Sequence, residues 1–206
     1  LELGLADLAQ IEKRRERLKK QMRTSKEAQV EDAALERIQE VLEQGGAARS
    51  VDLSPEELAM LRPLGLLTAK PIIYATNVSE EDLAEGNGYC EEVSDLAAKE
   101  AAETVRISAQ VEAELIELGD DERADYLEGL GVGEGGLQSL IQATYRLLGL
   151  RTYFTTGEKE TRAWTFKAGM TAPQAAGVIH TDFERGFIRA QTIGWEKLIE
   201  AGSLAE

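Results

Sequence analysis

The sequence holds one cysteine and one histidine in 206 residues, and it has no long apolar run. Cys90 has no second cysteine with which to form an internal disulfide, so we expect a reducing, intracellular setting. His180 has no cysteine or second histidine near it, which argues against a metal site. No stretch approaches the roughly 20 apolar residues of a membrane span, and no signal peptide opens the chain. We therefore expect a cytoplasmic protein without membrane contact.

Positive charge is also scarce, except in one window. The formal net charge of −15 argues against a nucleic-acid footprint spread over the whole surface. Between Lys13 and Lys26, however, eight basic residues stand against the single acid Glu16. Such a run is either a solvated helix face or a contact for an anionic partner such as the ribosome or ribosomal RNA. The residues that we assign to this contact are Lys13, Arg14, Arg17 and Lys20.

Residues 1–67 are predicted to form an α-helical coiled-coil hairpin. The first helix has apolar residues spaced by threes, fours and sevens, at Leu1, Leu8, Ile11, Leu18 and Met22. Thr24 and Ser25 can cap a second helix, which Gly45-Gly46 ends and whose apolar stripe is Ala28, Leu35, Ile38 and Leu42. The segment Ser54-Pro55-Glu56-Glu57 predicts a short third helix, because it combines an N-cap, a first-turn proline and a capping-box glutamate.

Residues 68–149 alternate strands with helices, which predicts an α/β fold with a doubly wound, mainly parallel sheet. We expect strands at 71–75 and 105–109, and helices at 94–104, 111–118, 122–130 and 137–148. The pattern changes in residues 150–206. Strands at 152–156 and 161–166, a helix at 172–179, a strand at 187–193 and a helix from 195 predict the opening of a β-grasp domain.

A polar loop follows each of the two strands in the middle region. The first reads Asn77-Val78-Ser79-Glu80, and the second reads Ser108-Ala109-Gln110. Open α/β sheets bind ligands at the carboxyl ends of their strands. The Asn77 amide can donate and accept, and the Glu80 carboxylate only accepts, so the pair could read the edge of a purine. Taken alone, four polar residues after a strand also fit an ordinary turn.

Three segments carry a resemblance to a known family: KPIIYATNVSEEDL, VRISAQVEAEL and LRTYFTTGEKETRAWTFKAGMTAPQAAGVIHTDFERGFIRAQ. They closely resemble the YchF-type Obg-like ATPases, a branch of the translation-factor-related P-loop NTPases. The resemblance covers essentially the whole chain and is most specific from Phe154 to Arg189. It implies that residues 1–67 are the coiled-coil insertion, 68–149 the second half of the nucleotide-binding P-loop NTPase domain, and 150–206 a truncated TGS domain of β-grasp type.

The resemblance also implies an ATP-binding protein that regulates translation or stress responses. It would associate with ribosomes through the basic residues named above and through the TGS domain. By motif match, Asn77, Val78 and Glu80 would contact adenine, while Ser108 and Ala109 would close the base pocket. In GTPases the same loops read NKxD and SAK, and the aspartate pairs with the N1–H and exocyclic amine of guanine. Glu80 and Val78 disrupt that fit, which predicts adenine over guanine.

The sequence contains no motif for phosphate binding. No GxxxxGK[ST] loop and no DxxG segment is present, and Gly131–Gly136 lacks a lysine, so we expect it to be a linker. We therefore assign no catalytic residue, and we expect Mg²⁺ only together with residues upstream of Leu1. The chain starts without Met and is interpreted as a fragment that does not hydrolyse ATP alone. The alternative is a non-catalytic RNA- or ribosome-binding module with a vestigial nucleotide pocket.

Overall fold

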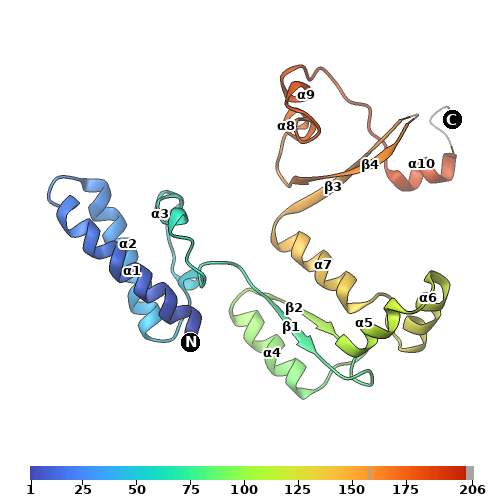
Figure 1. Cartoon of the computed structure of the whole chain (residues 1–206), viewed down its shortest axis with the longest axis horizontal. Helices are drawn as coiled ribbons and strands as arrows, with labels where there is room; N and C mark the ends of the chain where they lie inside the picture. Colours follow the sequence, from blue (N-terminus) through green and yellow to red (C-terminus); the bar gives the residue numbers. More distant parts are fainter. Residues whose placement is uncertain (158, 203–206) are drawn as a thin grey trace. The chain divides into compact units, whose positions relative to one another are not determined.

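A computed structural model describes residues 1–157 and 159–202 (Figure 1). The chain divides into two compact units, Leu1–Ala143 and Thr144–Glu206. The division falls inside helix α7 (Gly136–Leu147).

The first unit begins with two antiparallel helices, α1 (Glu2–Gln21) and α2 (Lys26–Glu43) (Figure 1). Ser25 caps α2 as predicted, because its side chain accepts a hydrogen bond from Ala28 N. The predicted stripe of α2 is buried throughout and packs on Ile11 and Leu18 of α1. The prediction that Leu1 belongs to the apolar seam is wrong. Leu1 is 98% exposed and takes no part in the seam, since it precedes the first helical turn.

Helix α3 (Pro55–Leu61) follows with the predicted capping box at Ser54 and Glu57. It lies between two 3₁₀ turns, η1 (Ala48–Ser50) and η2 (Arg62–Leu64). Leu61 and the nearby Leu66 join the core of α1 and α2. The segment after α2 therefore folds back on the hairpin instead of leading directly away from it.

Two parallel strands and the helix that connects them form the middle of the first unit. Strand β1 (Ile73–Asn77) pairs with β2 (Glu103–Ile107) in parallel, with α4 (Gly88–Lys99) as the crossover. Parallel pairing was predicted, but each strand lies two residues from its predicted bounds. Helix α4 starts six residues before the predicted Ser94, because Asn87 accepts hydrogen bonds from Tyr89 N and Cys90 N and so caps the helix.

Helices α5 (Ala109–Ile116) and α6 (Asp120–Gly129) follow β2 and share a small core. Buried Leu83, Val111 and Leu115 form the centre of this core. The Gly-rich segment after α6 leads into α7 and is a linker, as predicted. Its last residue, Gly136, is buried so closely against Ile107 that a Cβ atom there would lie 2.8 Å from the Ile107 Cα.

The second unit contains the antiparallel pair β3 (Leu150–Thr156) and β4 (Thr161–Lys167), as predicted. Helices α8 (Ala172–Gly177), α9 (Thr181–Arg185) and α10 (Trp195–Ala201) follow. The Tyr153 hydroxyl donates to Ala175 O at 3.0 Å, which fixes α8 to β3. The predicted strand at 187–193 is wrong. Those residues have no regular structure and pair with no strand among the described residues, and Ile188 is 91% exposed.

Candidate nucleotide-base site

The two loops predicted to meet a base are joined directly in the structure. Because β1 and β2 are parallel and Asn77 is in register with Ile107, both strands end at the same edge. The Asn77 Oδ1 accepts a hydrogen bond from Ala109 N at 3.0 Å, and Val78 N donates to Ile107 O at 2.9 Å. One side-chain bond and one backbone bond therefore hold the two loops together.

The predicted site residues differ in how open they are. Asn77, Glu80 and Ala109 are exposed. Ser108 is only 1% exposed, and its hydroxyl accepts from Val111 N at 3.5 Å, so it caps α5. Val78 packs partly buried against the core of Leu83, Val111 and Leu115. Ser108 and Val78 therefore shape the loops from behind, while the exposed residues present polar atoms to solvent.

The Asn77 side chain keeps part of its hydrogen-bonding capacity. An amide side chain has an oxygen that accepts and a nitrogen that donates two protons. Since the oxygen is held by Ala109, the Nδ2 remains as the outward donor. The Gln110 N–H is a second donor, because it lies in the first turn of α5, where helical N–H groups have no partner within the helix.

A second polar cluster closes the loop after β1, and it was missed at the sequence level. The Asp82 carboxylate accepts from Ser79 Oγ at 3.1 Å and from Asn87 Nδ2 at 2.8 Å. Arg106, on β2, donates to Ala84 O at 2.7 Å. These bonds hold the segment between the first loop, after β1, and helix α4 in one compact turn.

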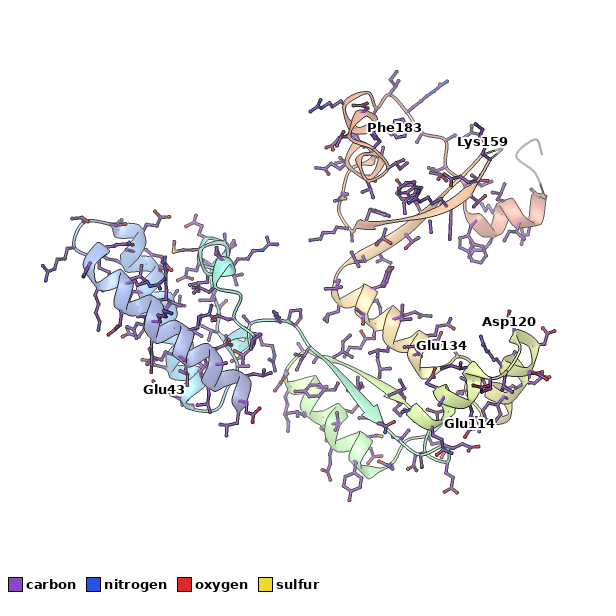
Figure 2. The ribbon with its side chains drawn as sticks, in the orientation of Figure 1. Glu43, Glu114, Asp120, Glu134, Lys159 and Phe183 are labelled. Carbon is purple, nitrogen blue, oxygen red and sulfur yellow. The ribbon has the colours of Figure 1, made fainter. Side chains whose placement is uncertain are left out.

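Behind the second loop lies a carboxylate that the sequence analysis also missed. Glu114 accepts from Gln110 Nε2 at 3.1 Å and from the Tyr126 hydroxyl at 2.5 Å. Figure 2 labels Glu114 on α5 and Asp120 at the start of α6. The Tyr126 hydrogen bond lowers the pKa of Glu114, and the same bond, followed by burial and the charges of Glu114 and Glu80, raises the pKa of Tyr126 to about 12.

Hydrogen bonds to two glutamates hold the linker and the start of α7 in place. Glu134 accepts from Ser139 Oγ and from Gln142 Nε2, both at 2.8 Å, which fixes the first turns of α7. Leu137 N donates to Glu112 at 3.2 Å. Within the described residues, no group of three or more His, Cys, Asp or Glu side chains is arranged to hold a metal ion.

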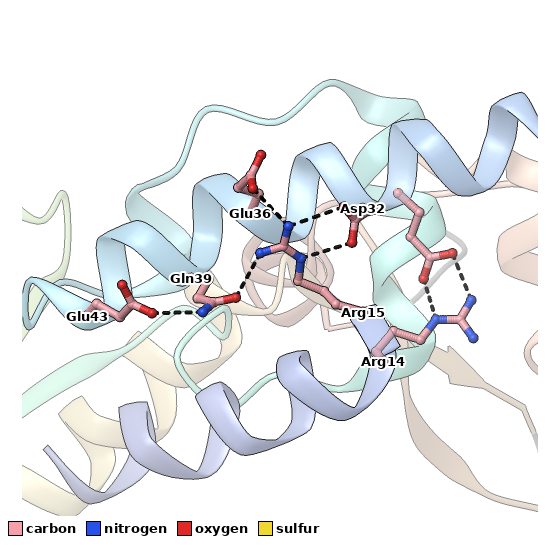
Figure 3. Close-up of polar contacts among 7 residues, drawn as sticks. Arg14, Arg15, Asp32, Glu36, Gln39 and Glu43 are labelled. Carbon is pink, nitrogen blue, oxygen red and sulfur yellow. Dashed lines mark hydrogen bonds and ion pairs between the residues drawn. The ribbon is translucent and has the colours of Figure 1, made fainter. Parts of the chain in front are cut away.

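The basic window on α1 separates into two faces. Arg14 turns towards α2 and forms a two-pronged ion pair with Glu31 at 2.6 and 2.7 Å, and Arg15 contacts Asp32, Glu36 and Gln39 (Figure 3). Arg14 is therefore engaged inside the hairpin. The other residues that we assigned to an anionic partner are exposed and recur at helical spacing: Lys13, Arg17 and Lys20.

Comparison with known proteins places the chain in a family. A family model described as "YchF-GTPase_C: Protein of unknown function (DUF933)" matches residues 150–206. The chain is 47% identical, over all of its length, to the ribosome-binding ATPase YchF of Bacillus subtilis. It is 50% identical, over 96% of its length, to the protein of the same name from Escherichia coli O157:H7. A solved structure, that of the Schizosaccharomyces pombe YchF GTPase, is similar over 97% of the chain, with a TM-score of 0.81 and 33% identity. The chain belongs to the YchF family.

Membership in the YchF family agrees with the α/β architecture described above. The chain spans only part of its YchF relatives: 57% of the Bacillus protein, 54% of the Escherichia protein and 55% of the Schizosaccharomyces chain. The names of these YchF relatives differ in the nucleotide that they imply, ATP for the bacterial proteins and GTP for the yeast protein. Among the residues that the structure describes, no helix is both long and apolar enough to cross a membrane.

Proposed function

We propose that residues 68–149 form the base-recognising part of an ATP site in a YchF-type P-loop NTPase. The observation that carries this proposal is the Asn77–Ala109 hydrogen bond, which joins two polar loops at the carboxyl edge of a parallel sheet. Parallel α/β sheets bind nucleotides at that edge. The relatives named ribosome-binding ATPase support ATP as the ligand.

The remaining polar atoms fit adenine. The Asn77 Nδ2 is free to donate to the purine N7, which adenine and guanine share. The exposed Glu80 carboxylate only accepts, so it can receive the exocyclic amine of adenine, whereas the guanine O6 is itself an acceptor. Val78 and Ser108 support the loops from behind, and the Ala109 N–H joins them through its bond to Asn77. Bound ATP supplies the phosphoanhydride, and its phosphates and Mg²⁺ require residues other than these.

Nucleotide affinity in the full-length protein tests the proposal. Asn77→Ala removes a contact that both bases share, and we expect it to weaken ATP and GTP alike by about 30-fold, which corresponds to about 2 kcal/mol. Glu80→Asp restores the shorter acid found in GTPases and should shift the ratio of the two Kd values towards GTP. Glu81→Asp is the matched control, since Glu81 is an exposed neighbour. Equal affinity of the unaltered protein for ATP and GTP would refute adenine recognition.

A second candidate function is ribosome association through the hairpin of residues 1–67. The exposed row of Lys13, Arg17 and Lys20 on α1 supports it, because the hairpin's own acids engage Arg14 and Arg15 instead. Ribosome association would place the protein in the cytoplasm, in keeping with the name of the bacterial relatives. Residues 150–206 would then act as a TGS-type partner-binding module, a proposal that the order of the β3–β4 pair and α8 supports.

A further inference from the structure

A row of side chains runs from the second base loop to helix α6. Gln110 directly follows Ala109, whose N–H bonds to Asn77. The Gln110 Nε2 donates to one oxygen of Glu114 at 3.1 Å, and the Tyr126 hydroxyl donates to the other oxygen at 2.5 Å. A hydroxyl that donates to a carboxylate at this length forms a strong, charge-assisted hydrogen bond.

Helix α6 is fixed against α5 by contacts that are independent of this hydroxyl. The Arg123 Nε donates to Leu115 O at 2.6 Å, at the end of α5. The Tyr126 side chain and Leu127 pack on the core of Leu83, Val111 and Leu115, where Val78 of the first base loop also packs. The ring of Tyr126 therefore has a defined position, and removal of its hydroxyl leaves the packing of α6 in place.

This arrangement determines which atom Gln110 presents to solvent. An ionised carboxylate only accepts hydrogen bonds, so the Gln110 amide must turn its nitrogen towards Glu114. The Gln110 Oε1 is then left as an acceptor on the exposed first turn of α5. An acceptor at that place can receive the exocyclic amine of adenine, but it opposes the guanine O6. Without the Tyr126 hydroxyl, one oxygen of Glu114 loses its partner, so the carboxylate can rotate away from Gln110 and the released amide can reverse.

We propose that Gln110 is a specificity-determining residue of the base site, and that Glu114 and Tyr126 are positioning residues that orient its amide. This inference rests on the proposed ATP site and adds to it three residues outside the NVSE and SA positions. It assigns selectivity to both loops instead of to the first loop alone.

The test is the ratio of GTP to ATP Kd values in the full-length protein, measured by calorimetry beside the thermal unfolding midpoint. Tyr126→Phe and Gln110→Ala should each reduce that ratio by about three- to tenfold, the effect of one hydrogen bond, with little change in the midpoint. Glu114→Gln should do the same, because an amide at 114 accepts either orientation of Gln110. Tyr89→Phe is the matched control, since Tyr89 is 78% exposed on α4.

The outcomes separate this inference from the proposed function. A protein that prefers ATP and keeps its full ratio in both Tyr126→Phe and Gln110→Ala overturns the inference but leaves the ATP site standing. A protein with no preference between ATP and GTP overturns both. Should Tyr126→Phe lower the unfolding midpoint, the exposed Gln110→Ala decides the question, because its side chain has no role in the core.

Discussion

At the scale of single residues, the buried acid Asp7 is a central polar contact of the first unit. Its side chain is 1% exposed and accepts three hydrogen bonds, from Leu67 N at 2.8 Å and from Thr68 N and Thr68 Oγ1 at 2.7 Å. The Thr68 hydroxyl in turn accepts from Ala48 N at 3.1 Å. A buried polar group is tolerated only when it is bonded in this way. Asp7 therefore fixes the chain just before β1 to helix α1.

We predict that Asp7→Asn strongly destabilises the first unit. The amide nitrogen would face backbone and hydroxyl donors, which loses at least one hydrogen bond and leaves donors buried without an acceptor. The expected cost is about 3 kcal/mol, or a fall of about 6 to 12 °C in Tm. Circular dichroism at 222 nm during heating measures it. Glu12→Gln makes the same change at an exposed position of α1 and should stay within about 0.5 kcal/mol. Equal midpoints for the two variants would contradict the role of Asp7.

At the scale of elements, the glycines of the linker before α7 have different roles. A Cβ atom at Gly136 would lie 2.8 Å from the Ile107 Cα, which is backbone and cannot move aside easily, whereas a Cβ atom at Gly133 meets nothing within 4 Å. Gly136→Ala should therefore cost about 1 to 3 kcal/mol by overpacking, and Gly133→Ala should be nearly neutral. Urea unfolding of the two variants gives the comparison. Similar midpoints would show that α7 can shift away from β2 at little cost.

The elements also show how far the sequence alone could predict this structure. Local signals sufficed for the α2 stripe, the Ser54 capping box and the parallel strand pair. Helix starts were less accurate where a side chain outside the apolar pattern supplies the cap, as Asn87 does for α4. The segment 187–193 has a strand-like sequence, but a strand also needs a hydrogen-bonded neighbour, which local pattern cannot reveal.

The same distinction applies to the candidate site. That the two loops lie together could be predicted, because parallel strands end at one edge, and the Asn77–Ala109 bond agrees with it. The contact of Tyr126 with Glu114 could not be predicted, since it depends on how α6 packs on α5 through buried side chains. Arg14 illustrates the converse. Sequence showed its charge, and only the structure showed that Glu31 engages it.

At the scale of the whole molecule, charge is divided along the chain. The window from Lys13 to Lys26 has eight basic residues and one acid, whereas residues 80–134 contain eighteen acids and three basic residues. An acidic region disfavours contact with nucleic acid, so within the first unit the long-range attraction for an anionic partner comes from this basic window. On α1, Arg14 and Arg15 are already paired with acids of α2, so this attraction comes from the side of α1 that faces away from α2.

This division predicts that the proposed ribosome binding depends on salt through one face of α1. Replacing Lys13, Arg17 and Lys20 together with glutamine should weaken binding to purified ribosomes at least tenfold at low salt and reduce the slope of log K against log[KCl] by about 2. Co-sedimentation at 50 to 200 mM KCl measures both quantities.

Arg14→Gln is the informative contrast. It removes one charge of the same window but leaves the Glu31 side chain, 7% exposed, without its partner. It should therefore lower stability by about 1 to 3 kcal/mol while the salt slope stays unchanged. If Arg14→Gln reduced the slope as much as the triple variant did, the ion pair within the hairpin would have to open on binding, and the two faces of α1 would not be distinct in the complex.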